Sequence, residues 1–373
     1  MSDLVIRDGK VLTPDGWRRE DLAIVDGSIA ATAPPGAAVF DASGLLVAPG
    51  LIDLQVNGGW GLDITSDGPS MWSLGDRLAE HGVTAYLPTV VTSPPSSVVA
   101  SLDALHRRPT EHRGAEPLGL HLEGPMIAVE KRGAHRSEHI RPPSLDLVDG
   151  WSRASGVTMV TLAPELDGAR VVIGELVSRG IVVAAGHTQA DAEQAAVGFD
   201  TGVTHVTHLF NAMPSFGHRA PGLGGAALAR QHVTAGLIVD GHHVHPDAVA
   251  TAWHAKGPGG IVLVSDSVAA LGLDHGEERL GDRPVVVREG AVRTPDGTLA
   301  GSAITLIEGV RNLIRLTGCR VEDALRAASS TPAGVIGATD RGRLSPGTRG
   351  DVVVLTEALD VVATVVGGRL LRP

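Results

Sequence analysis

The sequence of 373 residues contains a single cysteine, Cys319. One cysteine excludes a disulfide within the chain and a zinc site built on several thiolates. Cys319 lies in a stretch with helical character, where we expect it to pack and not to act as a nucleophile. Any chemistry must therefore come from other side chains.

Positive charge and long apolar runs are also scarce. The formal net charge is −11, and no run rich in lysine or arginine occurs, so we expect no nucleic-acid partner. No apolar run approaches membrane-spanning length, and the alternating residues near the start do not resemble a signal peptide. We therefore expect a cytoplasmic protein without a membrane partner.

Aromatic residues make up only 3% of the chain, whereas hydrophobic residues make up 43%. The core must therefore be built from Val, Leu, Ile and Ala, a mixture that suits buried parallel strands packed on helices. Between residues 49 and 340, apolar runs alternate with segments of helical spacing. The runs are LIDLQVNG, TAYLPTVV, PLGLHLEG, VTMVTLAPE, IVVAAGHT, HVTHLFNAM, AGLIVDGHH and GIVLVSDSV. Such alternation over eight units predicts an α/β fold, a (β/α)8 barrel of the TIM type.

Short alternating runs with Asp-Gly or Gly-Gly turns stand at both ends of the chain. The first such segment, residues 1–48, is too short to bury a core of its own. We predict one small β-sandwich domain built from residues 1–48 and 341–373. The barrel domain, residues 49–340, is then inserted between its two halves.

Polar residues stand at the ends of most apolar runs, where the active site of such a barrel lies. Glu123, His187 and His208 supply a carboxylate and two imidazoles, a ligand set for one catalytic metal with an open position for water. The metal would activate that water and polarise a substrate carbonyl. Asp266 is the natural general base and acid. We expect His243 to hydrogen-bond the carbonyl oxygen, and we favour this role over a metal pair formed with His245.

These motifs are specific enough to indicate a family. The chain resembles the N-acetylglucosamine-6-phosphate deacetylases of the amidohydrolase superfamily, almost from end to end. The resemblance rests on PGLIDLQVNG, GLHLEGP, KRGAH, GHT, THLFNAM, APGLGG, VDGHHV, LVSDS, GTLAGSAITL and GDVVVL. It implies hydrolysis of the N-acetyl amide of N-acetylglucosamine 6-phosphate to glucosamine 6-phosphate and acetate, in amino-sugar catabolism and cell-wall recycling.

The resemblance also implies residue roles. Glu123, His187 and His208 match the ligands of one divalent metal per subunit, for which we expect zinc, with iron or cobalt as alternatives. Asp266 matches the catalytic acid and base, and His243 the contact to the acetyl carbonyl. The other implied substrate contacts are Ala134, His135, Asn211, Ala212, Arg219, Leu299, Ala300 and Gly301. In the family the arginine reaches in from a neighbouring subunit, which implies a homodimer.

Three features depart from patterns seen in related enzymes. Gln55 and Asn57 stand where many amidohydrolases carry a His-x-His metal pair, and run four, ending in TLAPE, lacks the bridging lysine of many two-metal enzymes. The His-x-His pair and the bridging lysine both serve a second metal. We therefore interpret Gln55 and Asn57 as remnants of that second site beside an intact first site. They are predicted to fix a water or a sugar hydroxyl. Ala220 stands where an acidic residue is expected after Arg219, which affects the phosphate site.

Two alternative functions stay open. The chain could hydrolyse another amide, as an N-acyl-amino-acid deacylase or a cyclic-amide hydrolase, because a fold does not fix a substrate. It could also be a non-catalytic barrel. Such a barrel would be expected to lose metal ligands or the base, whereas Glu123, His187, His208 and Asp266 are all present.

Overall fold

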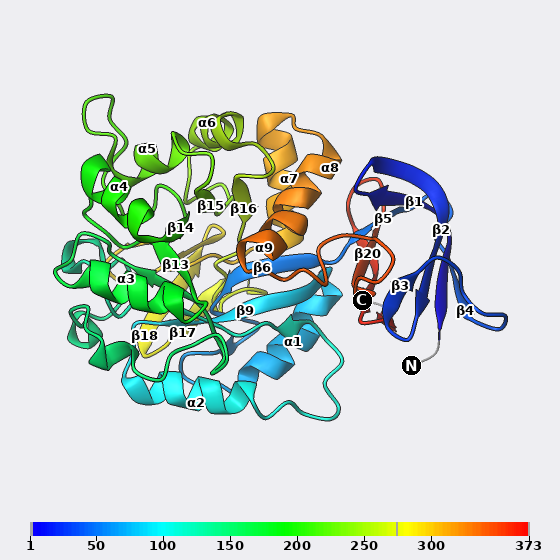
Figure 1. Ribbon diagram of the computed structural model, residues 1–373, viewed down its shortest axis with the longest axis horizontal. Coiled ribbons are helices and arrows are strands. Elements are labelled where there is room, and N and C mark those ends of the chain that lie inside the picture. The colour runs from blue at the N-terminus through cyan, green and yellow to red at the C-terminus, as the bar shows by residue number, and fades with distance from the viewer. Residues whose placement is uncertain (1–2, 274, 372–373) are drawn as a thin grey trace.

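A parallel β-barrel forms the larger part of the molecule, as Figure 1 shows for the computed structural model, which describes residues 3–273 and 275–371. Each of the eight apolar runs supplies one barrel strand. These are β6 (Leu51–Val56), β9 (Val83–Val91), β11 (Leu120–Glu123), β12 (Val157–Leu162), β13 (Val182–Ala185), β14 (Val203–Val206), β15 (Thr234–Leu237) and β16 (Ile261–Leu263). A short strand, β10 (Glu116–Pro117), pairs with β9. The predicted (β/α)8 barrel is confirmed.

The barrel closes between its first and last strands through segments that follow β16. The amide of Asp266 donates to the carbonyl of Gln55 at 2.9 Å, and the amide of Asn57 donates to the carbonyl of Ser267 at 2.8 Å. The buried carboxylate of Asp53 accepts the amide of Ser265 at 3.2 Å. This seam brings Gln55, Asn57 and Asp266 together.

Helices follow most barrel strands and surround the barrel (Figure 1). They are α1 (Ser70–Glu80), α2 (Pro95–Leu105), α3 (Ala169–Ser178), α4 (Ala192–Thr201), α5 (Gly222–Leu228), α6 (Pro246–Lys256), α7 (Leu306–Thr317), α8 (Val321–Ala327) and α9 (Ser330–Val335). Helices α4 and α7 begin at capping boxes, in which Asp191 pairs with Gln194 and Thr305 with Glu308. None of the described helices has the length and apolarity needed to cross a bilayer.

Two small sheets were not predicted from the sequence. One is antiparallel and comprises β17 (Gly276–Leu280), β18 (Arg283–Arg288) and β19 (Ala291–Arg293). It is inserted between β16 and α7, and it carries Leu280 to the wall of the central cavity. The other pairs β7 (Gly58–Gly59) with β8 (Leu62–Asp63).

Strands from both ends of the chain form one further sheet of eight strands, seen at the right of Figure 1. They are β1 (Leu4–Thr13), β2 (Gly16–Val25), β3 (Ser28–Ala30), β4 (Ala38–Asp41), β5 (Leu46–Pro49), β20 (Val352–Leu355), β21 (Val361–Val366) and β22 (Arg369–Leu371). The two ends meet where β5 pairs antiparallel with β20. A hydrophobic cluster with members such as Ile6 and Val354 lies within this unit. The domain boundaries at residues 48 and 341 stay predictions.

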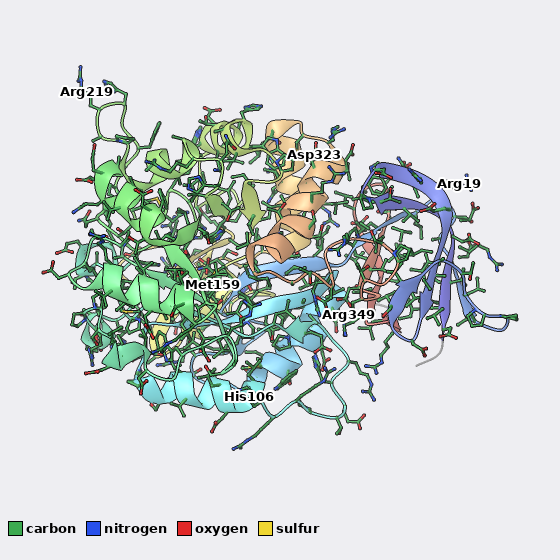
Figure 2. All side chains as sticks on the ribbon, viewed as in Figure 1. Arg19, His106, Met159, Arg219, Asp323 and Arg349 are labelled. Carbon is green, nitrogen blue, oxygen red and sulfur yellow. The ribbon has the colours of Figure 1, made fainter. Side chains whose placement is uncertain are left out.

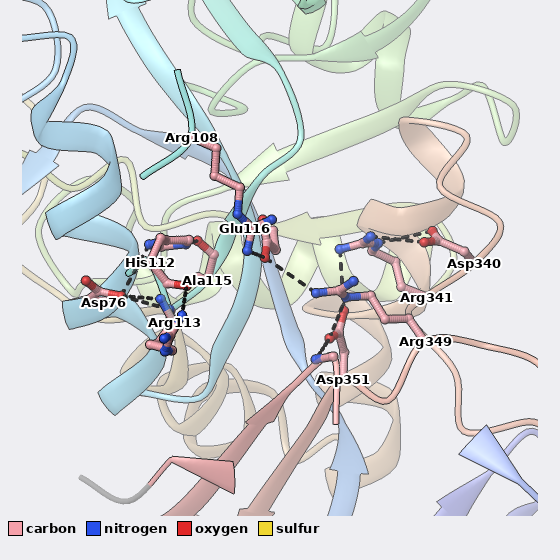
Figure 3. Close-up of polar contacts among 12 residues, drawn as sticks. Asp76, Arg108, His112, Arg113, Ala115, Glu116, Asp340, Arg341, Arg349 and Asp351 are labelled. Atoms are coloured by element: carbon pink, nitrogen blue, oxygen red, sulfur yellow. Dashed lines mark hydrogen bonds and ion pairs between the residues drawn. The ribbon is translucent and has the colours of Figure 1, made fainter. Parts of the chain in front are cut away.

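An ion-pair network lies where the terminal strands meet the barrel (Figure 3). Arg349 contacts Glu116 of β10 at 3.5 Å and Asp351, next to β20, at 3.0 Å. Arg341 contacts the same Asp351 at 3.4 Å, and Arg108 contacts Glu116 at 2.7 Å. The network therefore joins the edge of the barrel to the terminal sheet.

Candidate active site and metal centre

The predicted chemical residues gather at the carboxyl ends of the barrel strands. Glu123 is the last residue of β11, and His187 and His208 each follow their strand, β13 and β14, by two residues. Asp266 lies three residues beyond β16, and His243 six residues beyond β15. Parallel strands end at one rim of a barrel, so residues far apart in the sequence meet there.

Three ligand atoms converge within this group. Glu123 Oε1 lies 3.1 Å from His187 Nε2 and 3.0 Å from His208 Nε2, and the two imidazole nitrogens are 3.0 Å apart. Zinc bound tetrahedrally to nitrogen and oxygen at ~2.0–2.1 Å places its ligands roughly 3.3 Å from one another. The described triad therefore fits a divalent cation in both donor type and spacing.

The hydrogen bond on the far side of the His187 ring supports this fit. His187 Nδ1 lies 2.8 Å from the carbonyl oxygen of Lys131, which can only accept, so Nδ1 carries the proton. The neutral ring then presents a bare lone pair at Nε2, as a metal ligand requires. The Nδ1 atom of His208 is buried and has no protein partner among the described residues.

His135 also lies beside Glu123, and these two residues with His187 form another cluster of potential ligand atoms, all within 4.8 Å of one another. The Nδ1 atom of His135 accepts the amide of Thr92 at 3.3 Å. A neutral ring therefore carries its proton on Nε2, which lies 3.6 Å from Glu123 Oε2. Burial lowers the pKa of His135 to about 4, which favours this neutral form. Such a ring presents an N–H group at Nε2 toward Glu123 and does not bind a cation through that atom.

Charge within the site is concentrated on Glu123. Burial opposes ionisation of this carboxyl, but the imidazoles of His135, His187 and His208 hold its pKa well below its usual range. The site thus contains a buried carboxylate anion.

Gln55 and Asn57 contact the two functional carboxylates of the cavity. Gln55 Nε2 donates to Glu123 Oε1 at 3.0 Å, and Asn57 Nδ2 donates to Asp266 Oδ1 at 2.7 Å. Both amide side chains are buried. The amides that stand in place of a His-x-His pair therefore hold one proposed ligand and the proposed base.

Asp266 is buried beside an anion. Burial raises the pKa of its carboxyl to about 8, the charge of Glu123 adds to the rise, and the bond from Asn57 opposes it. A cation held by the adjacent triad would favour the ionised form. The carboxyl can therefore take up and release a proton within this site.

The backbone is strained at three of these residues. His187, His208 and Asp266 have φ angles of 50°, 30° and 49°, in the left-handed region that residues with a Cβ rarely adopt. Each is the second or third residue after a barrel strand. Such conformations cluster at functional sites, where the surrounding structure enforces them.

A cavity of about 290 Å³ adjoins the triad and contains most of the predicted site residues. Those that line it are Asn57, Glu123, Ala134, His135, His187, His208, Asn211, Ala212, His243, Asp266, Leu299, Ala300 and Gly301. Gln55 lies behind Glu123 and is not part of the wall. His245 is also absent from the wall, and its Nδ1 accepts an amide at the start of α6. The alternative pair of His243 and His245 therefore does not form.

Arg219 is the one predicted residue that lies far from the cavity wall. It stands at the tip of a loop that projects from the molecule between β14 and α5 (Figure 2). Phe216, on the same loop, is 56% exposed. Within a single copy of the chain, Arg219 therefore does not line the cavity.

Sequence reasoning missed Lys131, which also lines the cavity. Its Nζ donates to the carbonyl of Met213 at 3.0 Å, which ties the KRGAH segment to the loop after β14. Lys131 is the first residue of the KRGAH motif, and that motif could have indicated its place in the site. Leu280, also in the wall, belongs to the inserted sheet, which carried no clear pattern in the sequence, whereas Thr298 belongs to the GTLAGSAITL motif.

Comparisons with known proteins show the family to which the chain belongs. The amidohydrolase family model matches residues 46–371. The N-acetylglucosamine-6-phosphate deacetylase of Rattus norvegicus is 40% identical over 385 residues, which cover 99% of this chain and 91% of the relative. The N-acetylgalactosamine-6-phosphate deacetylase of Escherichia coli O157:H7 is 36% identical, with 98% of each chain covered.

Solved structures give the same result. The N-acetylglucosamine-6-phosphate deacetylase of Thermotoga maritima superimposes with a TM-score of 0.91 at 34% identity, covering 99% of this chain and 100% of that one. A mutant of the Mycobacterium smegmatis enzyme in complex with N-acetyl-D-glucosamine-6-phosphate gives a TM-score of 0.90 at 31% identity, with both chains fully covered. The chain belongs to the amidohydrolase family, in the group that contains the N-acetylglucosamine-6-phosphate deacetylases.

Proposed function

We propose that this chain hydrolyses the N-acetyl amide of N-acetylglucosamine 6-phosphate, giving glucosamine 6-phosphate and acetate. The observation that carries the proposal is the convergence of Glu123, His187 and His208 within 3.0–3.1 Å of one another in the cavity that Asp266 also lines. Relatives with this activity match the chain along nearly its whole length. The reaction belongs to amino-sugar catabolism and cell-wall recycling.

In this proposal Glu123, His187 and His208 hold one divalent ion, with zinc favoured by the nitrogen and oxygen donors and iron or cobalt as alternatives. When bound, the ion lowers the pKa of a water molecule and polarises a carbonyl oxygen. Asp266 accepts the proton of the attacking water and then delivers it to the nitrogen of the leaving amine. His243 contacts the acetyl carbonyl oxygen.

The remaining wall residues are assigned to the sugar and its phosphate. Ala134 and His135 contact the sugar, and Leu299, Ala300 and Gly301 line the pocket. The amide of Asn211 and the backbone of Ala212 contact the phosphate. Binding a phosphate calls for a cationic partner, and a guanidinium offers two parallel donors.

We assign this cationic partner to Arg219 of a second copy of the chain, which makes the functional unit a homodimer. The support is the projecting loop, on which Arg219 is exposed beside the exposed aromatic ring of Phe216. Ala220, in place of an acidic residue, leaves the guanidinium without one neighbouring acid. We also propose a cytoplasmic location, because a sugar phosphate is charged and does not cross a bilayer unaided.

The test is a deacetylation assay on a panel of acetylated amino sugars, with the metal content measured on the same sample. N-acetylglucosamine 6-phosphate is expected to give the highest kcat/KM and the unphosphorylated sugar a much lower one. Equal values for the two would contradict the phosphate contacts. A chain that binds no divalent metal and cannot be reconstituted would indicate a non-catalytic barrel.

A second candidate substrate is N-acetylgalactosamine 6-phosphate. A relative that is 36% identical over 98% of both chains bears the name of that deacetylase. The two sugars differ only in the configuration of one hydroxyl group, so the same panel separates them through the ratio of their kcat/KM values.

A further inference from the structure

The side chain of Asp240 contacts His243 from outside the cavity. His243 Nδ1 lies 2.6 Å from Asp240 Oδ2. The other oxygen, Oδ1, accepts the backbone amides of His242 at 2.8 Å and His243 at 2.9 Å. The side chain of Asp240 is only 2% exposed and that of His243 only 6% exposed. His243 lines the catalytic cavity, whereas Asp240 does not.

These contacts fix the position of one proton. An ionised carboxylate can only accept hydrogen bonds, so Nδ1 of His243 must be the donor. Burial opposes ionisation of Asp240, yet the bond from His243 lowers the pKa of the carboxyl to about 2. His243 Nε2 has no protein partner among the described residues. It is therefore the ring atom available to a ligand.

The role proposed for His243 needs a second proton. A neutral ring with its proton on Nδ1 has only a lone pair at Nε2 and cannot donate to a carbonyl oxygen. A ring that carries both protons can donate from Nε2, and an adjacent carboxylate stabilises that cation, as in other pairs of aspartate and histidine.

We propose that Asp240 is a positioning residue for the deacetylation. It orients His243 and stabilises the doubly protonated ring while Nε2–H donates to the substrate carbonyl oxygen. This inference rests on the proposed function, because it assumes that a carbonyl group binds next to His243. Charge-assisted donors are roughly twice as strong as neutral ones, so the carboxylate strengthens this contact as negative charge develops.

A purely structural role for Asp240 is the competing explanation, since Oδ1 also shapes the turn before α6. The substitution Asp240→Asn separates the two roles. The asparagine oxygen still accepts the backbone amides, whereas its NH2 group donates to Nδ1 and favours a neutral ring. Asp247→Asn, at an exposed position of α6, is the matched control.

A double-mutant cycle with His243→Asn gives the first readout. The amide of this asparagine replaces the Nδ1 donor to Asp240 but leaves nothing at the Nε2 position. In the otherwise wild-type enzyme, Asp240→Asn is expected to lower kcat about tenfold, with KM changed less than about twofold. In the His243→Asn background it should change kcat by less than about twofold. An equal loss in both backgrounds would overturn the proposal.

The second readout is nitrogen NMR of the His243 ring, which does not depend on turnover. The wild-type chain with its metal and the bound product glucosamine 6-phosphate should show a proton on Nδ1. This proton should be absent from Nδ1 in Asp240→Asn. A wild-type ring with Nδ1 unprotonated would refute the pairing. If the wild type fails to deacetylate the panel of sugars, the proposed function fails, and NMR of the metal-loaded chain alone still decides the pairing.

Discussion

At the scale of single residues, the site is defined by what its carboxylates and amides touch. Gln55 donates to Glu123, and Asn57 donates to Asp266. The pair of amides in GLIDLQVNG therefore contacts one proposed metal ligand and the proposed base. That the amides also fix a water or a sugar hydroxyl stays a prediction, and Asn57 Oδ1 is buried without a partner among the described residues.

Gln55→Leu should weaken metal binding without abolishing it. The substitution removes the donor that orients Glu123, and loss of such an outer partner typically costs about 10- to 100-fold in metal affinity. Competition with a chelator measures the change. Gln231→Leu, at an exposed position, is the control and should leave the affinity unaltered. Unchanged affinity in Gln55→Leu would show that Glu123 needs no orientation by the amide.

Asn57→Leu should act on turnover instead of on metal binding. Asn57 donates to Asp266 and thereby favours the ionised form that accepts a proton. Its loss should lower kcat by about tenfold, as expected for a charge-assisted hydrogen bond of about 1.5 kcal/mol. Metal content should stay at the wild-type level. A large loss of metal with normal kcat after reloading would contradict this division of labour between the two amides.

At the scale of elements, the seam between β6 and the segment after β16 places these residues. The sequence predicted each barrel strand because buried parallel strands form recognisable apolar runs. It could not predict that Gln55 meets Glu123, because a contact across 68 residues depends on strand order and register. Nor did it single out Asp240, although this residue is only three positions before His243.

The pH dependence of stability tests the buried seam residue Asp53. Burial raises its pKa to about 7, above the value near 4 of an unfolded aspartate. The unfolded chain therefore loses this proton first, and the contribution of Asp53 to the free energy of unfolding falls as the pH rises from about 4 to about 7.

Asp53→Asn removes this titration. The free energy of unfolding of wild type minus that of Asp53→Asn should therefore decrease between about pH 4 and pH 7 and level off above that range. Urea denaturation at several pH values measures this difference. Asp67→Asn, on an exposed loop, serves as the control. A difference that rises with pH would mean that the amide of Ser265 stabilises the carboxylate more than burial opposes it.

At the scale of the whole molecule, two ends of the chain and one barrel are held together at the ion-pair network of Figure 3. The terminal strands were predictable from their turns, but their junction with the barrel was not, because Glu116 and Arg349 carry no motif. The position of Arg219 also belongs to this scale, since its proposed role needs a second copy of the chain.

Asp351→Ala should destabilise the fold without affecting catalysis. Asp351 is 3% exposed and contacts both Arg341 and Arg349, so its removal leaves the buried Arg341 paired with Asp340 alone and Arg349 paired with Glu116 alone. Loss of hydrogen bonds to charged groups costs about 1.5–3 kcal/mol. The exposed pair of Arg18 and Asp15 provides the control, since Asp15→Ala should cost less than about 1 kcal/mol. A reduced kcat/KM in the folded Asp351→Ala enzyme would contradict the assignment.

The central claim is that one metal triad and one carboxylate carry out the deacetylation. The most direct test is Asp266→Asn, with metal content and turnover measured on the same sample. We predict one divalent ion per chain, as in the wild type. We also predict that kcat falls by about 10²- to 10⁴-fold, the range expected for general acid–base catalysis. Substantial residual turnover in the metal-loaded variant would contradict the account.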